Sequence, residues 1–217
     1  MEAVIPTRND YQHLPKILSV LKSCTGISKV YVVDNNSLPE ISSQIWAICQ
    51  RNPEAEYCFC EAVGKGNAIA VGIRASTEDV LFLDGDVENL SESMISSLLS
   101  KFSEGYALVK ANIRRKNGQS NSAFVLNKLK KLLPSLNVQR PTCGIYCVKR
   151  EVLNKIKIPP SWSVDLSILV QAHLFGFSIG EIDIGEIKDK PRSEESLAES
   201  KIVLQKELAF VEVMLHG

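Results

Sequence analysis

Short apolar runs alternate along the chain with longer segments whose apolar residues recur every three or four positions. The run at residues 3–5, ended by Pro6, is typical of a buried strand, and the spacing within residues 11–24 is typical of an amphipathic helix. This alternation continues to residue 111. It predicts strands at 3–5, 30–33, 56–60, 80–83 and 106–111, and helices at 11–24, 41–51, from the Gly64 loop to 75, and 91–102.

Strands and helices in this order predict a Rossmann-like α/β fold, with a mainly parallel sheet and helices on both of its faces. Ligands of such sheets bind outside the carboxyl ends of the strands. Polar clusters that begin at Asp34, Gly64 and Asp84 follow three of the predicted strands. We therefore expect a binding site at this edge of the sheet.

The pattern changes after residue 111. Residues 114–122 are polar and predict a loop, followed by a helix near 124–133, a strand near 145–148, a helix near 164–175, a strand near 178–184 and a helix near 193–215. A chain of 217 residues suits one domain, with 1–111 and 112–217 as its halves. The last helix carries an apolar stripe, which favours packing on its own domain and leaves a homodimer as the alternative. Its members are Leu197, Leu204, Leu208, Val211 and Leu215.

Composition and charge narrow the classes of partner. Lys+Arg and Asp+Glu both number 25, so no net positive charge attracts nucleic acid. The apolar runs are much shorter than the roughly 20 residues that cross a bilayer, and no leader pattern precedes the first strand, so we expect a soluble, cytoplasmic protein. In that compartment the six cysteines are expected to be reduced thiols, mostly buried, and not metal ligands.

Asp84-Gly85-Asp86 follows an apolar strand directly. Two carboxylates beside a glycine can hold a hard divalent cation and leave positions open for phosphate oxygens, so the triplet fits Mg²⁺ or Mn²⁺ with a nucleoside diphosphate. The same triplet also forms ordinary turns. Asp34-Asn35-Asn36-Ser37 likewise can hydrogen-bond a base or ribose, or serve only as a loop.

Gly64-Lys65-Gly66-Asn67 opens a predicted helix, whose free N–H groups and the Lys65 ammonium favour an anion. Asp84 lies twenty residues beyond Gly64, as in the dinucleotide-binding fingerprint. However, Ile69 stands where that fingerprint has its third glycine, and the loop follows the third strand. These mismatches disfavour an NAD-dependent dehydrogenase.

Four spaced motifs together carry a family resemblance. They are V-I-P-T-R-N-D at 4–10, V-V-D-N-N-S at 32–37, G-K-G-N-A at 64–68 and F-L-D-G-D at 82–86. Their order resembles nucleotide-sugar-dependent glycosyltransferases of the GT-A fold, in particular the family-2-like group and the related glucosyl-3-phosphoglycerate synthases. The second half is similar at 109–114, 141–146, 164–169 and 182–190.

The resemblance implies a role for each matching position. It places the nucleotide sugar at Pro6, Thr7, Arg8, Asp34, Asn35, Lys65, Gly66 and Asp84, and a Mg²⁺ or Mn²⁺ ion at Asp84, Asp86 and Asp189. It implies catalytic roles for Asp86 and Asp165 and acceptor contacts for Thr142, Cys143 and Gly144. Two positions depart from the synthases, which have a glutamate at the position of Asp165 and a histidine at that of Asp189.

We therefore expect a hexosyltransferase that uses a UDP- or GDP-linked sugar and a small anionic acceptor, such as a phosphoglycerate-like compound. Arg114, in a basic run that ends at Lys116, suggests the anionic acceptor, and Trp162 is a candidate for stacking on a sugar. Two alternatives remain. A sugar-phosphate nucleotidylyltransferase would have a glycine-rich loop after the first strand, which this chain lacks, and a catalytically silent nucleotide-binding module would explain the changes at Asp165 and Asp189.

Overall fold

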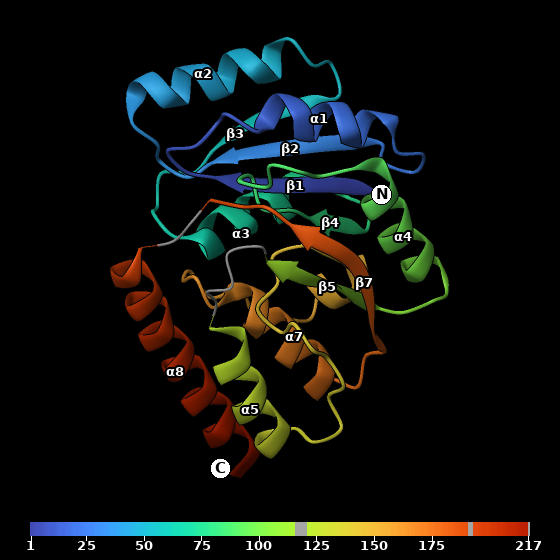
Figure 1. The fold of residues 1–217 in the computed structure, drawn as a ribbon, viewed down its shortest axis with the longest axis vertical. Coiled ribbons are helices and arrows are strands. Elements are labelled where there is room, and N and C mark those ends of the chain that lie inside the picture. Colours follow the sequence, from blue (N-terminus) through green and yellow to red (C-terminus); the bar gives the residue numbers. More distant parts are fainter. Residues whose placement is uncertain (116–120, 191–192, 217) are drawn as a thin grey trace.

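The computed structural model describes residues 1–115, 121–190 and 193–216. Within them, seven strands form one sheet in the order β3-β2-β1-β4-β6-β5-β7 (Figure 1). Only β6 runs antiparallel to its neighbours, β4 and β5, and every other pair is parallel. The strands are β1 (Glu2–Thr7), β2 (Lys29–Asp34), β3 (Ala55–Phe59), β4 (Val80–Phe82), β5 (Leu108–Arg115), β6 (Tyr146–Val148) and β7 (Ile179–Ile187).

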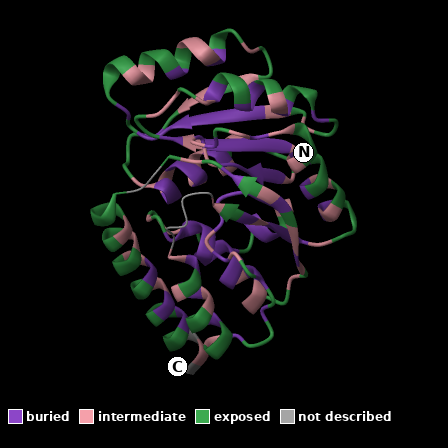
Figure 2. Cartoon of the chain, in the orientation of Figure 1, coloured by how far each residue is buried: buried purple, intermediate pink, exposed green. Residues whose placement is uncertain are grey.

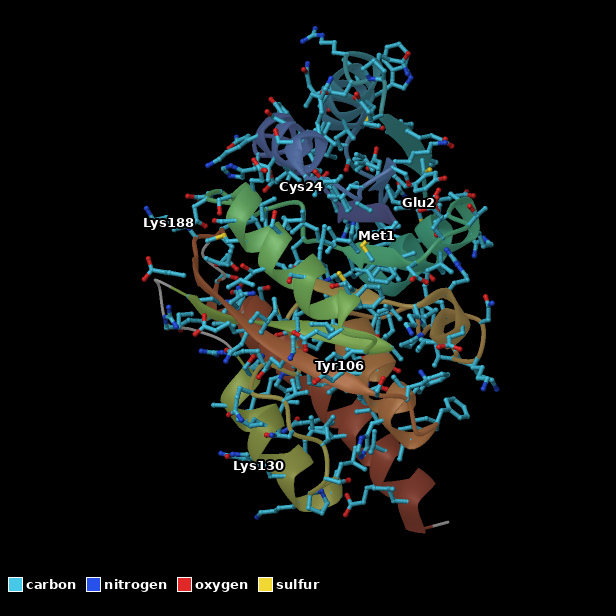
Figure 3. All side chains as sticks on the ribbon, turned by 90° about the vertical axis from the view of Figure 1, so that its right-hand side faces the viewer. Met1, Glu2, Cys24, Tyr106, Lys130 and Lys188 are labelled. Carbon is cyan, nitrogen blue, oxygen red and sulfur yellow. The ribbon has the colours of Figure 1, made fainter. Side chains whose placement is uncertain are left out.

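Helices cover both faces of the sheet, which confirms the predicted α/β fold. One face packs on α1 (Leu14–Ser23), α2 (Pro39–Gln50) and α4 (Glu92–Ser103). The other packs on α3 (Lys65–Ala75), α5 (Ser122–Leu132), α7 (Val164–Leu174) and α8 (Glu194–His216). Figure 1 shows α5 and α8 side by side, and in Figure 3 β7 runs from the region of Tyr106 towards Lys188.

Successive side chains of a strand point to opposite faces of the sheet, so each strand contributes to both hydrophobic cores. Ala3 and Ile5 of β1 belong to the core on the α1 side, and Val4 belongs to the core on the α3 side. Helix α7 differs from the amphipathic helices, because almost all of its residues are buried between the sheet and α8. A helix that is apolar on all sides is expected at such a central position.

Several boundaries differ from the predictions. β5 continues to Arg115, into the segment expected to be a loop, because β7 extends to Ile187 and pairs with it there. The short helix α6 (Arg150–Leu153) was not predicted. Lys116, at the end of the basic run, lies outside the described residues.

Two side chains of the helices reach the surface or its edge. Trp46 is exposed on the outer side of α2. His173 of α7 is half-buried, and its Nε2 atom lies 3.1 Å from the Ser135 hydroxyl. All six cysteines are free thiols, and five of them are buried, as expected.

The apolar stripe of α8 packs on its own domain. Leu204, Leu208 and Val211 are buried in the core that includes α5 and α7, whereas the outer face of α8 is exposed (Figure 2). The favoured interpretation of the stripe is therefore confirmed, and the homodimer stays a prediction. None of the described helices combines the length and apolar character that a bilayer span requires.

The two sides of α8 should respond differently to truncation. Leu208 is 4% exposed, so Leu208→Ala should lower the free energy of unfolding by about 2–4 kcal/mol through lost burial and a residual cavity. Phe210 is 59% exposed, and Phe210→Ala should change it by less than about 0.5 kcal/mol. Urea denaturation measures both. Equal losses, or dissociation of an oligomer by Phe210→Ala, would contradict this packing.

Candidate functional site

The carboxyl ends of β1, β2 and β4 meet at one edge of the sheet. Thr7 at the end of β1 pairs with Asp34 at the end of β2, and Val4 pairs with Phe82 at the end of β4. The segments that follow these strands line two cavities, of about 180 and 440 Å³. The cavities share Arg8, Lys65, Asp84, Asp86 and Trp162, so they form two parts of one cleft.

Polar groups from β1 and β2 form the smaller cavity. Pro6, Thr7, Arg8 and Asn35, which the resemblance assigned to the nucleotide sugar, all line it. The Asn35 amide is held in place, because its Nδ2 donates to the Ala62 carbonyl at 2.7 Å and its Oδ1 accepts from the Gly64 amide at 2.7 Å. The wall of this cavity is therefore fixed before any ligand binds.

Asp34, predicted to contact the nucleobase, is fully buried and does not line either cavity. Its carboxylate accepts hydrogen bonds from the Ser42 hydroxyl at 2.6 Å, the Tyr57 hydroxyl at 3.0 Å and the Ser37 amide at 3.0 Å. Asp34 thus shapes the loop after β2, and Asn35 presents that loop to the cavity. The donors to Asp34 come from α2, β3 and the loop itself.

Lys65 lies at the junction of the two cavities, almost fully buried. Its ammonium is 2.6 Å from Asp84 Oδ1 and 2.6 Å from Asp165 Oδ2. Burial by itself lowers the pKa of Lys65, but the two carboxylates outweigh that effect and raise the pKa above its ordinary value. Lys65 is therefore a permanent cation that joins the end of β4 to the first turn of α7.

The start of α3 is covered by the segment that leads to α7. A Cβ atom on Gly66 would lie 1.7 Å from the Pro159 carbonyl oxygen, so only glycine permits this approach. Gly66 lines neither cavity. Of the groups predicted to bind an anion, the Lys65 side chain therefore lines the cleft, and the backbone of the helix N-terminus at Gly66 does not.

Asp165 faces the larger cavity from the first turn of α7. Its Oδ1 accepts a hydrogen bond from the Tyr146 hydroxyl at 3.1 Å, and its Oδ2 pairs with Lys65. Burial first, and then the Asp165 charge, raise the pKa of Tyr146 well above its usual range, so its hydroxyl remains a donor. The carboxylate is consequently fixed by one donor on each oxygen.

The predicted acceptor loop, residues 142–144, lies against the turn formed by residues 84–86, the DGD turn. A Cβ on Gly144 would be 2.2 Å from Asp84 Oδ2, so the backbone of this loop touches the carboxylate directly. Thr142 and Cys143 line the larger cavity, and the Thr142 hydroxyl lies 2.7 Å from that of Ser122 at the start of α5. The structure therefore brings the two predicted halves of the site together.

Acidic side chains crowd the space beside the DGD turn. Burial, and then the charges of Asp84 and Asp189, raise the pKa of Asp86 from 3.8 to about 6, although Lys65 and Arg115 oppose the shift. Asp189 forms an ion pair with Arg115. Among the described residues, no three acidic, histidine or cysteine side chains are arranged as a ready-made metal site. The donor set nevertheless fits a hard divalent cation, because it consists of carboxylate oxygens with excess negative charge.

Arg114, predicted to contact the acceptor, lines neither cavity. Its exposed guanidinium pairs with Asp183 at 2.6 Å on the outside of β5 and β7. The larger cavity is lined instead by two other arginines. They are Arg115, the next residue of β5, and Arg140, which comes shortly before the acceptor loop. No described residue forms an ion pair with the Arg140 guanidinium. Arg140 could have been identified from the sequence, because it directly precedes the Pro141-Thr-Cys-Gly144 motif.

Sequence reasoning also missed one wall of the larger cavity. The first turns of α8 supply it, although the sequence pattern indicated only a packing helix. Its lining residues are Ser196, Glu199, Ser200, Val203 and Leu204.

Comparison with known proteins relates this chain to one family. The family model described as glycosyl transferase family 2 matches residues 2–155. A curated relative, glucosyl-3-phosphoglycerate synthase of Mycolicibacterium smegmatis, is 24% identical over 193 residues, which cover 80% of this chain and 64% of the relative. The chain thus spans less than two thirds of the length of that relative.

Solved structures of glucosyl-3-phosphoglycerate synthase from Mycobacterium tuberculosis share the fold. The complex with Mn²⁺, UDP and phosphoglyceric acid has a TM-score of 0.82 and 21% identity, over 95% of this chain and 77% of that one. The complex with Mn²⁺, UDP-glucose and phosphoglyceric acid has a TM-score of 0.81 and 20% identity, over 95% and 78%. The likeness extends across almost all of the chain, and the family match covers well over half of it. The chain belongs to glycosyl transferase family 2.

Proposed function

We propose that this protein is a metal-dependent glycosyltransferase that moves a hexose from a UDP- or GDP-linked sugar to a small acceptor carrying an anionic group. Family membership supports the reaction class, and the ligands named for the neighbouring structures support the metal, donor and acceptor. The observation that carries the proposal is the position of Lys65, which pairs with Asp84 and Asp165 where the two cavities join. Donor and acceptor sites would meet at that junction.

The smaller cavity is the proposed nucleotide site. The fixed Asn35 amide and the loop Pro6–Arg8 supply polar groups for the base and ribose, and Arg8 and Lys65 supply positive charge for a diphosphate. Trp162 is 56% exposed and lines both cavities. An aromatic ring at the junction is suited to cover the apolar face of the transferred sugar.

A divalent cation would be held by Asp86 and Asp189, with Asp84 beside them. When bound, Mg²⁺ or Mn²⁺ supplies charge neutralisation for the departing nucleoside diphosphate. The raised pKa of Asp86 supports this placement in part, because burial is its largest cause and the negative charges of Asp84 and Asp189 are the next. Carboxylates that repel each other bind a cation more strongly than an isolated one does.

The larger cavity is the proposed acceptor site. Arg140 supplies a cation without an ion-pair partner in the described chain, and the Thr142 and Ser122 hydroxyls, 2.7 Å apart, line the same cavity. An acceptor phosphate or carboxylate there would receive charge-assisted hydrogen bonds. Asp165 lines the same cavity and is the carboxylate that an acceptor hydroxyl would meet.

Nucleotide and metal should stabilise the protein together. With UDP or GDP at about 100 times Kd and Mn²⁺ present, mass action adds about 2.7 kcal/mol, which raises Tm by about 5–10 °C in a chain of this size. Thermal shift measures it, with ADP as the control nucleotide, and UDP release from UDP-glucose with 3-phosphoglycerate measures transfer. No shift with either nucleotide would refute the proposal. Binding without turnover across donors and acceptors would favour a silent module.

Asp86→Asn should have opposite effects on the ligand-free and the metal-bound protein. A carboxyl whose pKa rises on folding costs stability where it is charged in the folded state, above about pH 6, and the cost disappears by about pH 4. The variant should therefore gain about 1–3 kcal/mol at pH 7.5, lose that gain at pH 4, and lose the Mn²⁺-dependent part of the UDP shift.

Asp183→Asn is the matched control for this variant. The Gly185 amide and Arg114 lower the pKa of Asp183, so removing its charge should not stabilise the protein. Thermal denaturation at the two pH values measures both variants. An Asp86→Asn protein that keeps its full metal response would exclude Asp86 as a ligand.

Arg140→Gln should reduce kcat/KM for 3-phosphoglycerate about 10- to 100-fold, because one charge-assisted interaction is worth about 1.5–3 kcal/mol. The KM for the nucleotide sugar should stay within about twofold. Arg114→Gln, on the outside of the sheet, is the matched control and should leave both constants unchanged. Steady-state kinetics with each substrate varied measures this, and equal effects of the two variants would contradict the assignment.

A further inference from the structure

Lys110 is a buried cation that the proposed reaction does not use. It lies in the middle of β5, fully buried, in register with Tyr146 of β6 on the side of the sheet that packs on α7. Its ammonium lines neither cavity. It therefore lies beneath the proposed acceptor site, separated from solvent by the groups that form that site.

Fold stability does not account for a lysine at this position. Burial lowers the pKa of Lys110, and the Asp165 charge offsets this only in part. The ammonium also lies at the first turn of α7, 3.5 Å from the Asp165 carbonyl, and a helix N-terminus is the unfavourable end for a cation. An apolar side chain of similar length would avoid both costs.

The contacts of Lys110 connect three parts of the site. Its Nζ donates a hydrogen bond to the Cys143 carbonyl in the acceptor loop. It lies 4.0 Å from the centre of the Tyr146 ring, and the Tyr146 hydroxyl donates to Asp165 Oδ1. One buried cation thus contacts the acceptor loop, the first turn of α7 and the tyrosine that orients Asp165.

We propose that Lys110 is a positioning residue that fixes the acceptor loop relative to Asp165. The inference rests on the proposed function, because the effect it assigns to Lys110 is on the rate of glycosyl transfer. The acceptor loop also touches Asp84 through Gly144, so a shift of the Cys143 carbonyl alters the spacing between the acceptor, Asp165 and the DGD turn. Small errors in such spacing cost large factors in rate.

The contacts predict which step depends on Lys110. The three residues that Lys110 contacts are Cys143, Tyr146 and Asp165, and none of them lines the smaller cavity. Nucleotide binding should therefore survive the loss of Lys110. Transfer should not, because the loop and Asp165 lose their common anchor. A merely structural lysine would instead affect unfolding, with both steps changed together.

Lys110→Met tests this separation. We expect kcat for transfer from UDP-glucose to 3-phosphoglycerate to fall at least 30-fold, with the affinity for UDP and Mn²⁺ changed less than threefold and Tm within a few degrees of the parent. Lys149→Met is the matched control, because Lys149 lies at the other end of the sheet with its Nζ 3.5 Å from the Gly105 carbonyl. It should leave kcat and affinity unchanged.

Tyr146→Phe separates the contact between Lys110 and the Tyr146 ring from the hydrogen bond between the Tyr146 hydroxyl and Asp165. It keeps the ring next to Lys110 and removes only the hydroxyl that donates to Asp165. If both residues act through Asp165, the double variant should lose little more activity than Lys110→Met alone. Losses that multiply would overturn the shared role.

Amide hydrogen exchange provides a readout that does not need turnover. In Lys110→Met, exchange should become faster in residues 140–146 and 163–167 and stay unchanged elsewhere in the described chain. Unchanged exchange there, or faster exchange throughout the sheet, would overturn the proposal. Should Lys110→Met not fold, Tyr146→Phe must still show faster exchange at 163–167 alone. A parent protein that transfers nothing would refute the proposed function, and the exchange result would still decide the role of Lys110.

Discussion

The geometry of the cleft depends on one ammonium group that is removed from water between two carboxylates. Burial of a lysine costs free energy unless its charge is paired and its hydrogen bonds are made. Lys65 meets this condition with Asp84, from the end of β4, and Asp165, from α7, one hundred positions along the chain. The two halves of the chain must therefore converge at this point for the site to exist.

The fold was predictable because its determinants are local. Strand and helix periodicities differ, and the apolar run before Asp84 places the DGD turn at the sheet edge whatever the rest of the chain does. The location of the cleft followed from the same argument, because the carboxyl ends of parallel strands lie together. These predictions needed no knowledge of side-chain partners.

The roles of individual side chains depend on partners that are distant in the sequence. Asp34 lies outside the cleft, where its carboxylate accepts hydrogen bonds from Ser42 and Tyr57, which belong to other elements. Arg114 lies on the outside and Arg115 lines the larger cavity, because β5 continues as a strand and successive side chains point to opposite faces. Neither outcome has a signature in the local sequence.

The family model covers only some of the residues that form the cleft. The match ends at residue 155, so it covers β1 to β4, the DGD turn and the acceptor loop. Asp165, Asp189 and the α8 wall lie beyond it. Asp165 and the α8 wall line the larger cavity, and Asp165 and Asp189 are the two positions at which the resemblance departs from the synthases. Glu199 and the α8 serines Ser196 and Ser200 line the same cavity as Arg140. Because this wall lines the proposed acceptor cavity and not the nucleotide site, its residues are the ones that would distinguish one acceptor from another.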